Sequence, residues 1–248
     1  MNGPLLTVTH LTARHGLLTA VREMSLTVRA GEVVSLVGAN GAGKSTLLRT
    51  IAGAHPATAG HIALGGRDVT GMRAYQRVRE GIALVPEGRR LFPDLTVEEN
   101  LLVAAGRSRT TRWDLDRVLA AFPMLRPLLR QRASSLSGGQ QQATAIARAL
   151  LTGPRLLLVD EVSLGLSPAA VADVYASLAT LAAEGVTMIL VEQDLTRAMS
   201  AAGRVVCLRE GQMVLAQPAD AVTRQQVVDA YFGIRESAVP ADASRERT

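Results

Sequence analysis

The stretch that decides the fold is Gly38-Ala39-Asn40-Gly41-Ala42-Gly43-Lys44-Ser45. It matches the phosphate-binding loop pattern G-x-x-x-x-G-K-[ST] at every fixed position. The apolar, β-branched run 32–37 before it predicts a buried strand, and residues 45–52 after it have the spacing of a helix. Glycines let the backbone approach an anion closely, and the N–H groups at a helix start favour phosphate. The stretch therefore predicts a nucleoside triphosphate site between a strand and a helix.

Only one of the 27 lysine and arginine residues is a lysine, and it is Lys44. Arginine occupies every other cationic position, so we infer that the loop requires a compact ammonium group. Lys44 is expected to contact the β- and γ-phosphates of the nucleotide, and the Ser45 hydroxyl is expected to ligate Mg²⁺. The loop thus predicts that a nucleoside triphosphate binds together with Mg²⁺.

The bulk composition favours one domain with subdomains in a cytoplasmic protein. The chain has 248 residues, 48% of them hydrophobic, with a mean hydropathy of +0.18. No run approaches the ~20 apolar residues that span a bilayer, and the first residues lack the basic segment of an export signal. The single cysteine, Cys207, excludes an internal disulfide and lies in an apolar run, where we expect a buried, inert thiol.

The positive charge of the chain raises the question of nucleic-acid binding. The net charge is +5 and the pI 10.3, yet aromatic residues make up only 3% and the arginines are scattered. Nucleic-acid surfaces combine clustered cations with stacking side chains, which this sequence does not do. A solvated basic surface near anionic lipid explains the charge as well. We therefore expect no nucleic acid among the partners.

A small antiparallel layer is predicted ahead of the loop. Residues 5–11 and 24–29 alternate apolar and polar side chains, as half-buried strands do. In the segment 13–16 between them, His15 is a candidate to stack on the base of the nucleotide. A histidine in a surface loop is the alternative interpretation.

The section from about 94 to 150 is predicted to be helical. Thr96 and Glu99 form a capping box, and periodic pieces follow over 114–122, 125–130 and 140–151.

Two segments next to these helices carry candidate functional residues. The apolar strand at 82–85 breaks at Pro86 into a charged loop with Glu87, which is a candidate moving part. Ser137 and two glycines immediately precede the helix that starts near Gln140, which predicts a second anion-binding helix end, since an ordinary cap would need only one of those residues.

Polar residues follow two further buried strands, at 155–159 and 186–191. Asp160 is placed where Mg²⁺ would be held through water, and Glu161 where a general base would polarise the attacking water. A solvated charge pair at a strand end is the alternative interpretation of this pair. After the second strand, Gln193 is a candidate γ-phosphate sensor.

The rest of the chain shows simpler patterns. Helices are predicted over 168–184 and 219–232, and a hairpin over 205–216. The residues of the tail 235–248 predict disorder.

Together these stretches resemble the ATP-binding cassette (ABC) ATPases over about 5–233. Leu136-Ser137-Gly138-Gly139-Gln140 is identical to the signature motif of that family. The resemblance implies an α/β fold, with a P-loop NTPase (RecA-like) core, an antiparallel β subdomain and an α-helical subdomain. We expect a single domain at 1–234, with the β subdomain at about 1–35 and 54–70 and the helical one at about 94–150.

The resemblance also implies a set of site residues, with ATP as the nucleotide and Mg²⁺ as its metal. The implied catalytic residues are Glu161, Gln193 and Lys44. The implied Mg²⁺ residues are Ser45, Glu87 and Asp160. The implied nucleotide contacts are His15, Gly38, Ala39, Asn40, Gly41, Ala42, Gly43, Lys44, Ser45, Thr46, Glu87, Ser137, Gly138, Gly139 and Gln140.

Several positions depart from the usual family pattern. Glu87 stands where most cassettes have a glutamine, and Gln193 where most have a histidine. Ser167 replaces an aspartate. The sequence around 85–93, 163–166 and 191–193 resembles the ATP-binding proteins of branched-chain amino-acid importers, in which Glu and Gln at these two positions are normal. His15, in place of an adenine-stacking tyrosine, and Val162, in place of a proline, are departures within that branch too.

The resemblance implies a head-to-tail dimer with a second ABC ATPase subunit, in which ATP lies between the loop of one and the signature of the other. It also implies membrane permease subunits and, indirectly, a periplasmic or lipid-anchored solute-binding protein. The expected location is cytoplasmic, peripheral to the inner face of the cell membrane. A branched-chain amino-acid importer is the preferred interpretation. The alternatives are a related system for urea, amides or lipids, and a weakly hydrolysing regulatory subunit.

Overall fold

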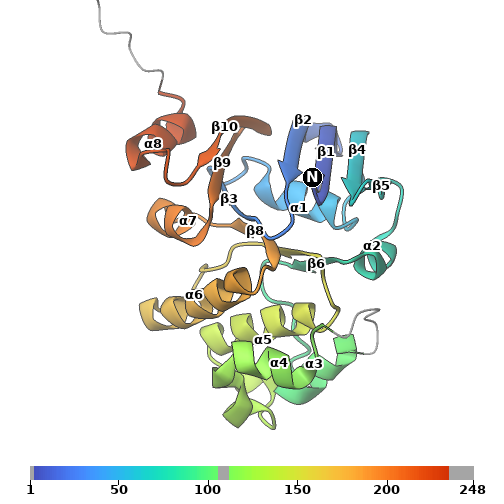
Figure 1. Ribbon diagram of the computed structural model, residues 1–248, viewed down its shortest axis with the longest axis vertical. Helices are drawn as coiled ribbons and strands as arrows, with labels where there is room; N and C mark the ends of the chain where they lie inside the picture. Colours follow the sequence, from blue (N-terminus) through green and yellow to red (C-terminus); the bar gives the residue numbers. More distant parts are fainter. Residues whose placement is uncertain (1–2, 106–111, 235–248) are drawn as a thin grey trace, which may run out of the picture.

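A six-stranded sheet carries the phosphate-binding loop at its centre (Figure 1). The computed structural model describes residues 3–105 and 112–234. The strands, in sheet order, are β10 (Gln212–Pro218), β9 (Arg204–Arg209), β3 (Val33–Val37), β8 (Thr187–Val191), β7 (Leu156–Val159) and β6 (Ile82–Val85). The pairings are parallel except for β10, which runs antiparallel to β9. The predicted hairpin near the C-terminus is this β9–β10 pair.

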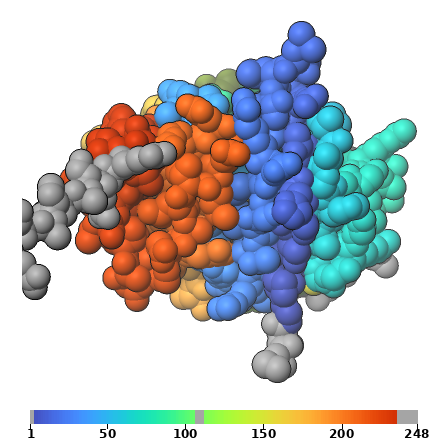
Figure 2. All heavy atoms as spheres, turned by 90° about the horizontal axis from the view of Figure 1, so that it is seen from above, coloured from blue at the N-terminus to red at the C-terminus, as the bar shows by residue number. Residues whose placement is uncertain are grey.

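A second, four-stranded antiparallel sheet lies beside it. It contains β2 (Leu18–Val28), β1 (Leu6–His15), β4 (Ala59–Leu64) and β5 (Arg67–Asp68), in that order. Seen from above, the blue β1–β2 hairpin lies between the orange C-terminal strands and the cyan β4 segment (Figure 2).

The first two strands are longer than their sequence pattern predicts. The segment 13–16, expected to lie between strands, is mostly the end of β1, and the chain turns only at Gly16 and Leu17. Irregularities in the β1–β2 register, together with left-handed backbone at His10 and Glu23 (both φ 46°), interrupt the alternation of side chains. Because a bulge shifts which face a residue occupies, the period-two pattern ends before the strand does.

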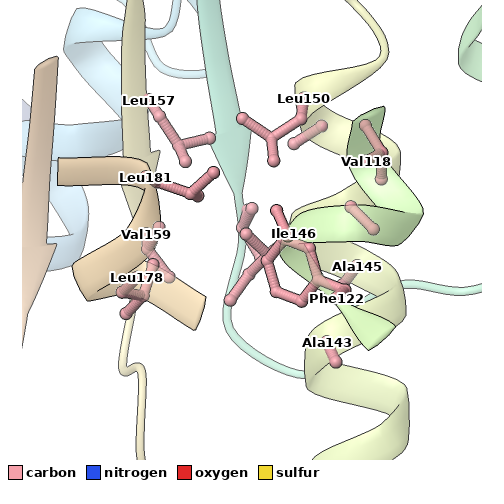
Figure 3. Packing of buried hydrophobic residues seen from close by; sticks show 14 of the residues in the cluster. Val118, Phe122, Ala143, Ala145, Ile146, Leu150, Leu157, Val159, Leu178 and Leu181 are labelled. Carbon is pink, nitrogen blue, oxygen red and sulfur yellow. The ribbon is translucent and has the colours of Figure 1, made fainter. Parts of the chain in front are cut away.

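The two faces of the six-stranded sheet are covered by different layers. Alternating side chains of β7 divide between them: Leu156 and Leu158 pack with the antiparallel sheet and α1 (Lys44–Ile51), whereas Leu157 and Val159 pack with helices. Those helices are α3 (Val97–Ala105), α4 (Leu115–Ala121), α5 (Gly138–Leu150) and α6 (Pro168–Ala183). Figure 3 shows Phe122 and Ile146 next to the strands on this face.

The remaining elements correct parts of the prediction. They are α2 (Ala74–Glu80), α7 (Leu195–Ala201), α8 (Arg224–Phe232) and two 3₁₀ helices, η1 (Pro123–Leu128) and η2 (Ala133–Ser135). The helix expected over 125–130 is the 3₁₀ helix η1, because Pro127 has no N–H to donate inside an α-helix. The helix expected from 219 starts only at Arg224, since the Thr223 hydroxyl accepts from the Gln226 N–H and caps it there. Helix α7 was not predicted.

No helix in the described part of the chain is long and apolar enough to cross a membrane. The tail 235–248, for which disorder is predicted, lies outside the described residues. The boundaries of the single domain and of its subdomains remain predictions.

Candidate functional site

A cavity of about 510 Å³ opens where β3, β7 and β8 end. Its lining residues are His15, Leu18, Ala20, Asn40, Gly41, Gly43, Lys44, Ser45, Thr46, Glu87, Glu161, Leu164 and Gln193. The structure thus brings ten of the residues predicted for the site to one cavity. Carboxyl ends of parallel strands are the usual place for ligands in such sheets.

The loop before α1 has a backbone that only glycine fits at two positions. Gly38 (φ 149°) and Gly43 (φ 100°) both have positive φ. A Cβ on either would lie 2.2 Å from a carbonyl oxygen, that of Leu208 for Gly38 and that of Ala20 for Gly43. The backbone at Leu208 and Ala20 therefore packs directly against this loop, and that packing holds its N–H groups in place at the start of α1.

The Lys44 side chain lies under this loop. Its ammonium donates to the carbonyl oxygens of Gly38 (2.6 Å) and Ala39 (2.9 Å). Burial lowers the pKa of Lys44, and the nearby Glu161 and Asp160 carboxylates partly offset that effect. Gly38 and Ala39 therefore contribute backbone atoms around Lys44, although neither lines the cavity. Ala42 does not line the cavity either, and its carbonyl accepts from the Gly211 N–H.

Ser45 and Asp160 meet although 115 positions separate them. The Ser45 hydroxyl donates to Asp160 Oδ1 at 2.9 Å, while Asp160 Oδ2 is buried without a hydrogen-bond partner. Burial raises the pKa of Asp160, with smaller contributions from Glu161 and Glu87 that also raise it. A hydroxyl beside a carboxylate oxygen with free lone pairs is a donor set that suits a hard divalent cation. Within the described residues, no group of three or more Asp, Glu, His or Cys side chains is arranged to hold a metal ion by itself.

Glu161 and Gln193 both line the cavity and contact each other directly. The Gln193 Nε2 donates to Glu161 Oε1 at 3.0 Å. Glu161 has left-handed backbone (φ 53°), which is strained for a residue other than glycine and is a feature that collects at functional sites. The Val162 N–H donates to the Val191 carbonyl at 3.2 Å, a bond that a proline at this position could not make.

Two further predicted residues lie on the cavity wall. Glu87 Oε2 is 4.0 Å from Arg49, in an exposed pair. His15 Nε2 is 3.2 Å from the Thr46 hydroxyl, and its ring centroid is 4.3 Å from that of His55. His15 thus belongs to the end of a strand that reaches the site, rather than to a separate surface loop.

The signature stretch does not reach this cavity in the same chain. Ser137 caps α5, accepting from the Gln140 N–H at 3.4 Å, and its own N–H bonds the Gln140 side chain at 2.9 Å. A Cβ on Gly139 would lie 2.5 Å from the Ala170 Cβ, so α5 and α6 approach each other closely here. None of the four residues Ser137–Gln140 lines the cavity.

Sequence reasoning missed three lining residues, Leu18, Ala20 and Leu164. Leu18 and Ala20 start β2 just after the hairpin turn, which the pattern did not locate. A hairpin prediction from Gly16 would have been the signal for them.

Comparison with known proteins agrees with this geometry. The family model described as "ABC transporter" matches residues 21–163. The chain is 43% identical over 234 residues to the high-affinity branched-chain amino acid transport ATP-binding protein BraG of Pseudomonas aeruginosa, covering 92% of this chain and 100% of BraG. It is 33% identical to BraF of the same organism, covering 94% and 99%.

Solved structures give the same result. The dimeric, ADP- and phosphate-bound post-hydrolysis state of the cassette MJ0796 aligns with a TM-score of 0.75 at 25% identity, covering 86% of this chain and 98% of that one.

Proposed function

This chain belongs to the ABC transporter family, whose cassettes bind and hydrolyse ATP, and on that premise we propose that it is the ATPase subunit of a branched-chain amino-acid importer. The observation that supports the reaction best is that Lys44, Ser45 and the Glu161–Gln193 pair line one cavity, with Asp160 bonded to Ser45 beside it. The transported solute is inferred from the likeness to BraG.

In this proposal the loop holds the nucleotide phosphates. Backbone N–H groups at the start of α1 bind them, and the Lys44 ammonium turns from the two loop carbonyls toward the β- and γ-phosphates. His15, Leu18 and Ala20 form the side of the cavity left for the base. Ser45 and Asp160 would hold Mg²⁺, with Glu87 nearby, and the bound ion would neutralise phosphate charge.

Hydrolysis requires a group that takes a proton from the attacking water. We assign that role to Glu161, whose carboxylate lines the cavity, and the role of γ-phosphate contact to Gln193. An amide can donate to phosphate through its NH₂ while its oxygen accepts from water, so Gln193 can stand in for a neutral histidine.

The signature stretch Ser137–Gln140 is proposed to act on a nucleotide held by a second cassette. Its capped helix end offers N–H groups but does not line the cavity of its own chain. A head-to-tail dimer would bring this end against the γ-phosphate on the partner and complete each site.

The segment Glu87–Pro93 is proposed to contact the permease. Phe92 (49% exposed) and Val103 (43% exposed) line an apolar cavity of about 340 Å³ on the face away from α1. Glu87, at the start of the same segment, lines the nucleotide cavity. A helix of a membrane permease seated here would place the chain peripherally on the inner face of the cell membrane, with a solute-binding protein acting through that permease.

Reconstitution tests the function. The chain, its partner cassette and the permease subunits would be placed in lipid vesicles with the solute-binding protein, and ATPase activity measured with leucine, isoleucine or valine. We expect stimulation by these solutes and ATP-dependent uptake. Stimulation by urea, an amide or a lipid instead would overturn the solute assignment, and no turnover with any partner would favour a regulatory subunit.

A further inference from the structure

A buried carboxylate, Glu192, lies beside the cavity without lining it. It follows β8 directly and is 2% exposed. Its Oε1 accepts from the Ser163 hydroxyl (2.7 Å) and from the N–H groups of Gln193 (2.9 Å) and Asp194 (3.1 Å). Its Oε2 accepts from the Tyr175 hydroxyl at 2.5 Å. One side chain thus connects the loop after β7, the loop after β8 and helix α6.

This carboxylate is held by hydrogen bonds and not by a counter-charge. Among the described residues no Arg, Lys or His lies within ion-pair distance of it. Arg197 bonds the Ser163 hydroxyl at 3.4 Å and pairs with Asp194 at 3.9 Å, and not with Glu192. Burial and the bond to Glu192 raise the pKa of Tyr175, so the phenol keeps its proton and remains a donor.

The bonds of Glu192 close a ring that contains both reactive side chains of the proposed site. Gln193, held at its N–H by Glu192, bonds Glu161 through its side chain. Ser163, held by Glu192, is two residues after Glu161 in the chain. A change in the position of the Glu192 carboxylate therefore shifts Glu161 and Gln193 relative to each other.

We propose that Glu192 is the positioning residue that sets the distance between Glu161 and Gln193 for hydrolysis. The inference rests on the roles proposed above for those two residues. It predicts that charge at position 192 affects turnover through Gln193, and not through nucleotide affinity.

The test compares Glu192→Gln, Gln193→Ala and the double variant in the assembled, reconstituted complex. Glu192→Gln keeps the shape but removes the charge that strengthens all four hydrogen bonds, and it replaces one acceptor oxygen by an NH₂ donor, so we expect kcat to fall about tenfold or more. The Kd for ATP should stay within about twofold of the parent, because phosphate binding uses the loop at α1. In the Gln193→Ala background, Glu192→Gln should cost less than about twofold in kcat.

Additive losses in the double variant, or an equal loss in ATP affinity, would overturn the positioning role. If Gln193→Ala alone leaves kcat unchanged, the proposed role of Gln193 fails and this inference fails with it. If Gln193→Ala lowers kcat and its effect adds to that of Glu192→Gln in the double variant, the role of Gln193 stands and only this inference fails.

A second variant covers the case in which Glu192→Gln does not fold. Tyr175→Phe removes one donor to Oε2 and leaves the three bonds to Oε1 in place. We expect a smaller fall in kcat that again disappears in the Gln193→Ala background, and a persistent fall would contradict the proposal. Asp220→Asn, at an exposed carboxylate, is the matched control for loss of one negative charge.

Discussion

The Gln193 side chain donates a hydrogen bond of 3.0 Å to Glu161 Oε1, which joins the ends of two neighbouring parallel strands. If Glu161 is the general base, as proposed, it can act through Oε1 only after this bond loosens, or it can act through Oε2, which this bond leaves free. Substitutions at Glu161 and at Gln193 should therefore affect hydrolysis in different ways.

Glu161→Gln should keep ATP binding and the contact with Gln193, because the new amide oxygen can still accept from Nε2. It removes the general base, which typically costs about 10²–10⁴-fold in turnover. We expect an ATP-bound dimer to accumulate, detectable by gel filtration with ATP. Unchanged turnover in this variant would show that Glu161 is not the base.

Lys44→Ala should abolish tight ATP binding, since the sequence holds no other lysine and phosphate would face backbone alone. Lys44→Arg keeps the positive charge and tests whether the size of the group matters. A guanidinium is too large to replace a buried ammonium held by two loop carbonyls, so we expect it to fail as well. Binding would be measured by calorimetry, and an affinity within about twofold of the parent would refute the assignment.

Asp160→Asn should raise the stability of the chain without nucleotide and Mg²⁺. The folded-state pKa of Asp160 is raised above its ordinary value of 3.8, so its charge opposes folding at neutral pH. That penalty disappears as the pH falls through the folded-state pKa. We expect a gain in the unfolding free energy at pH 7 and a weaker pH dependence at acid pH.

With Mg²⁺ and ATP present, the carboxylate of Asp160 should stabilise the protein instead of destabilising it. The parent should then gain more stability than Asp160→Asn, because a carboxylate binds the ion better than an amide does. Denaturant titrations with and without Mg²⁺–ATP would check both statements. Equal stabilisation of the two proteins by Mg²⁺–ATP would exclude Asp160 from the metal site.

The sequence predicted the local parts of the site well and the long-range parts unevenly. The loop at 38–45, Asp160–Glu161 and Gln193 each follow a strand, and strand ends in a parallel sheet meet at one edge, so their convergence could be expected. Leu18 and Ala20 were missed because bulges in β1 hid where the hairpin turns.

The position of Glu192 could not be predicted from the sequence. Glu192 follows a buried strand just as Gln193 does, and no local pattern shows that Glu192 is buried while Gln193 lines the cavity. Its partner Tyr175 lies on a helix whose rotation about its own axis no local pattern specifies. The loop after β6 was predicted to be a charged, candidate moving part, and no local pattern shows that its Arg89 bonds Gln141 (3.0 Å) and the Leu164 carbonyl (3.4 Å).

Replacing Gln193 by histidine should make hydrolysis depend on pH. An amide gains no charge as the pH falls, so the parent should show no step from this position. Gln193→His should introduce a step near the usual histidine range of about 6–7. The measurement is kcat against pH for both proteins, with His61→Gln as a control at a histidine remote from the cavity. Identical profiles for the parent and Gln193→His would mean that this position does not contact the reacting groups.

The last prediction concerns Arg148, on α5, which fixes the segment that we assign to the permease. Its Nη2 donates to the carbonyl oxygens of Arg89 (3.1 Å) and Arg90 (2.8 Å), two residues with left-handed backbone (φ 63° and 50°). Such backbone costs about 1–3 kcal/mol per residue and persists only where neighbours enforce it. Arg148→Met should therefore release the segment, and Arg148→Lys should do so less, because an ammonium can still donate to one of the carbonyls.

A cysteine at Phe92 can report this release without removing the native thiol. Cys207 is buried, and burial raises its pKa to about 11, so it should not react with an alkylating reagent at pH 7. We expect Phe92→Cys to react faster when combined with Arg148→Met, and permease-stimulated ATPase to fall while basal ATPase stays within about twofold, because Arg148 lies outside the nucleotide cavity. Adding Arg90→Gly should reverse part of the change, since glycine adopts positive φ without strain. If Phe92→Cys reacts at the same rate with and without Arg148→Met, other contacts hold the segment. If the permease stimulates the ATPase of Arg148→Met fully, the contacts of Arg148 with this segment are not needed for coupling.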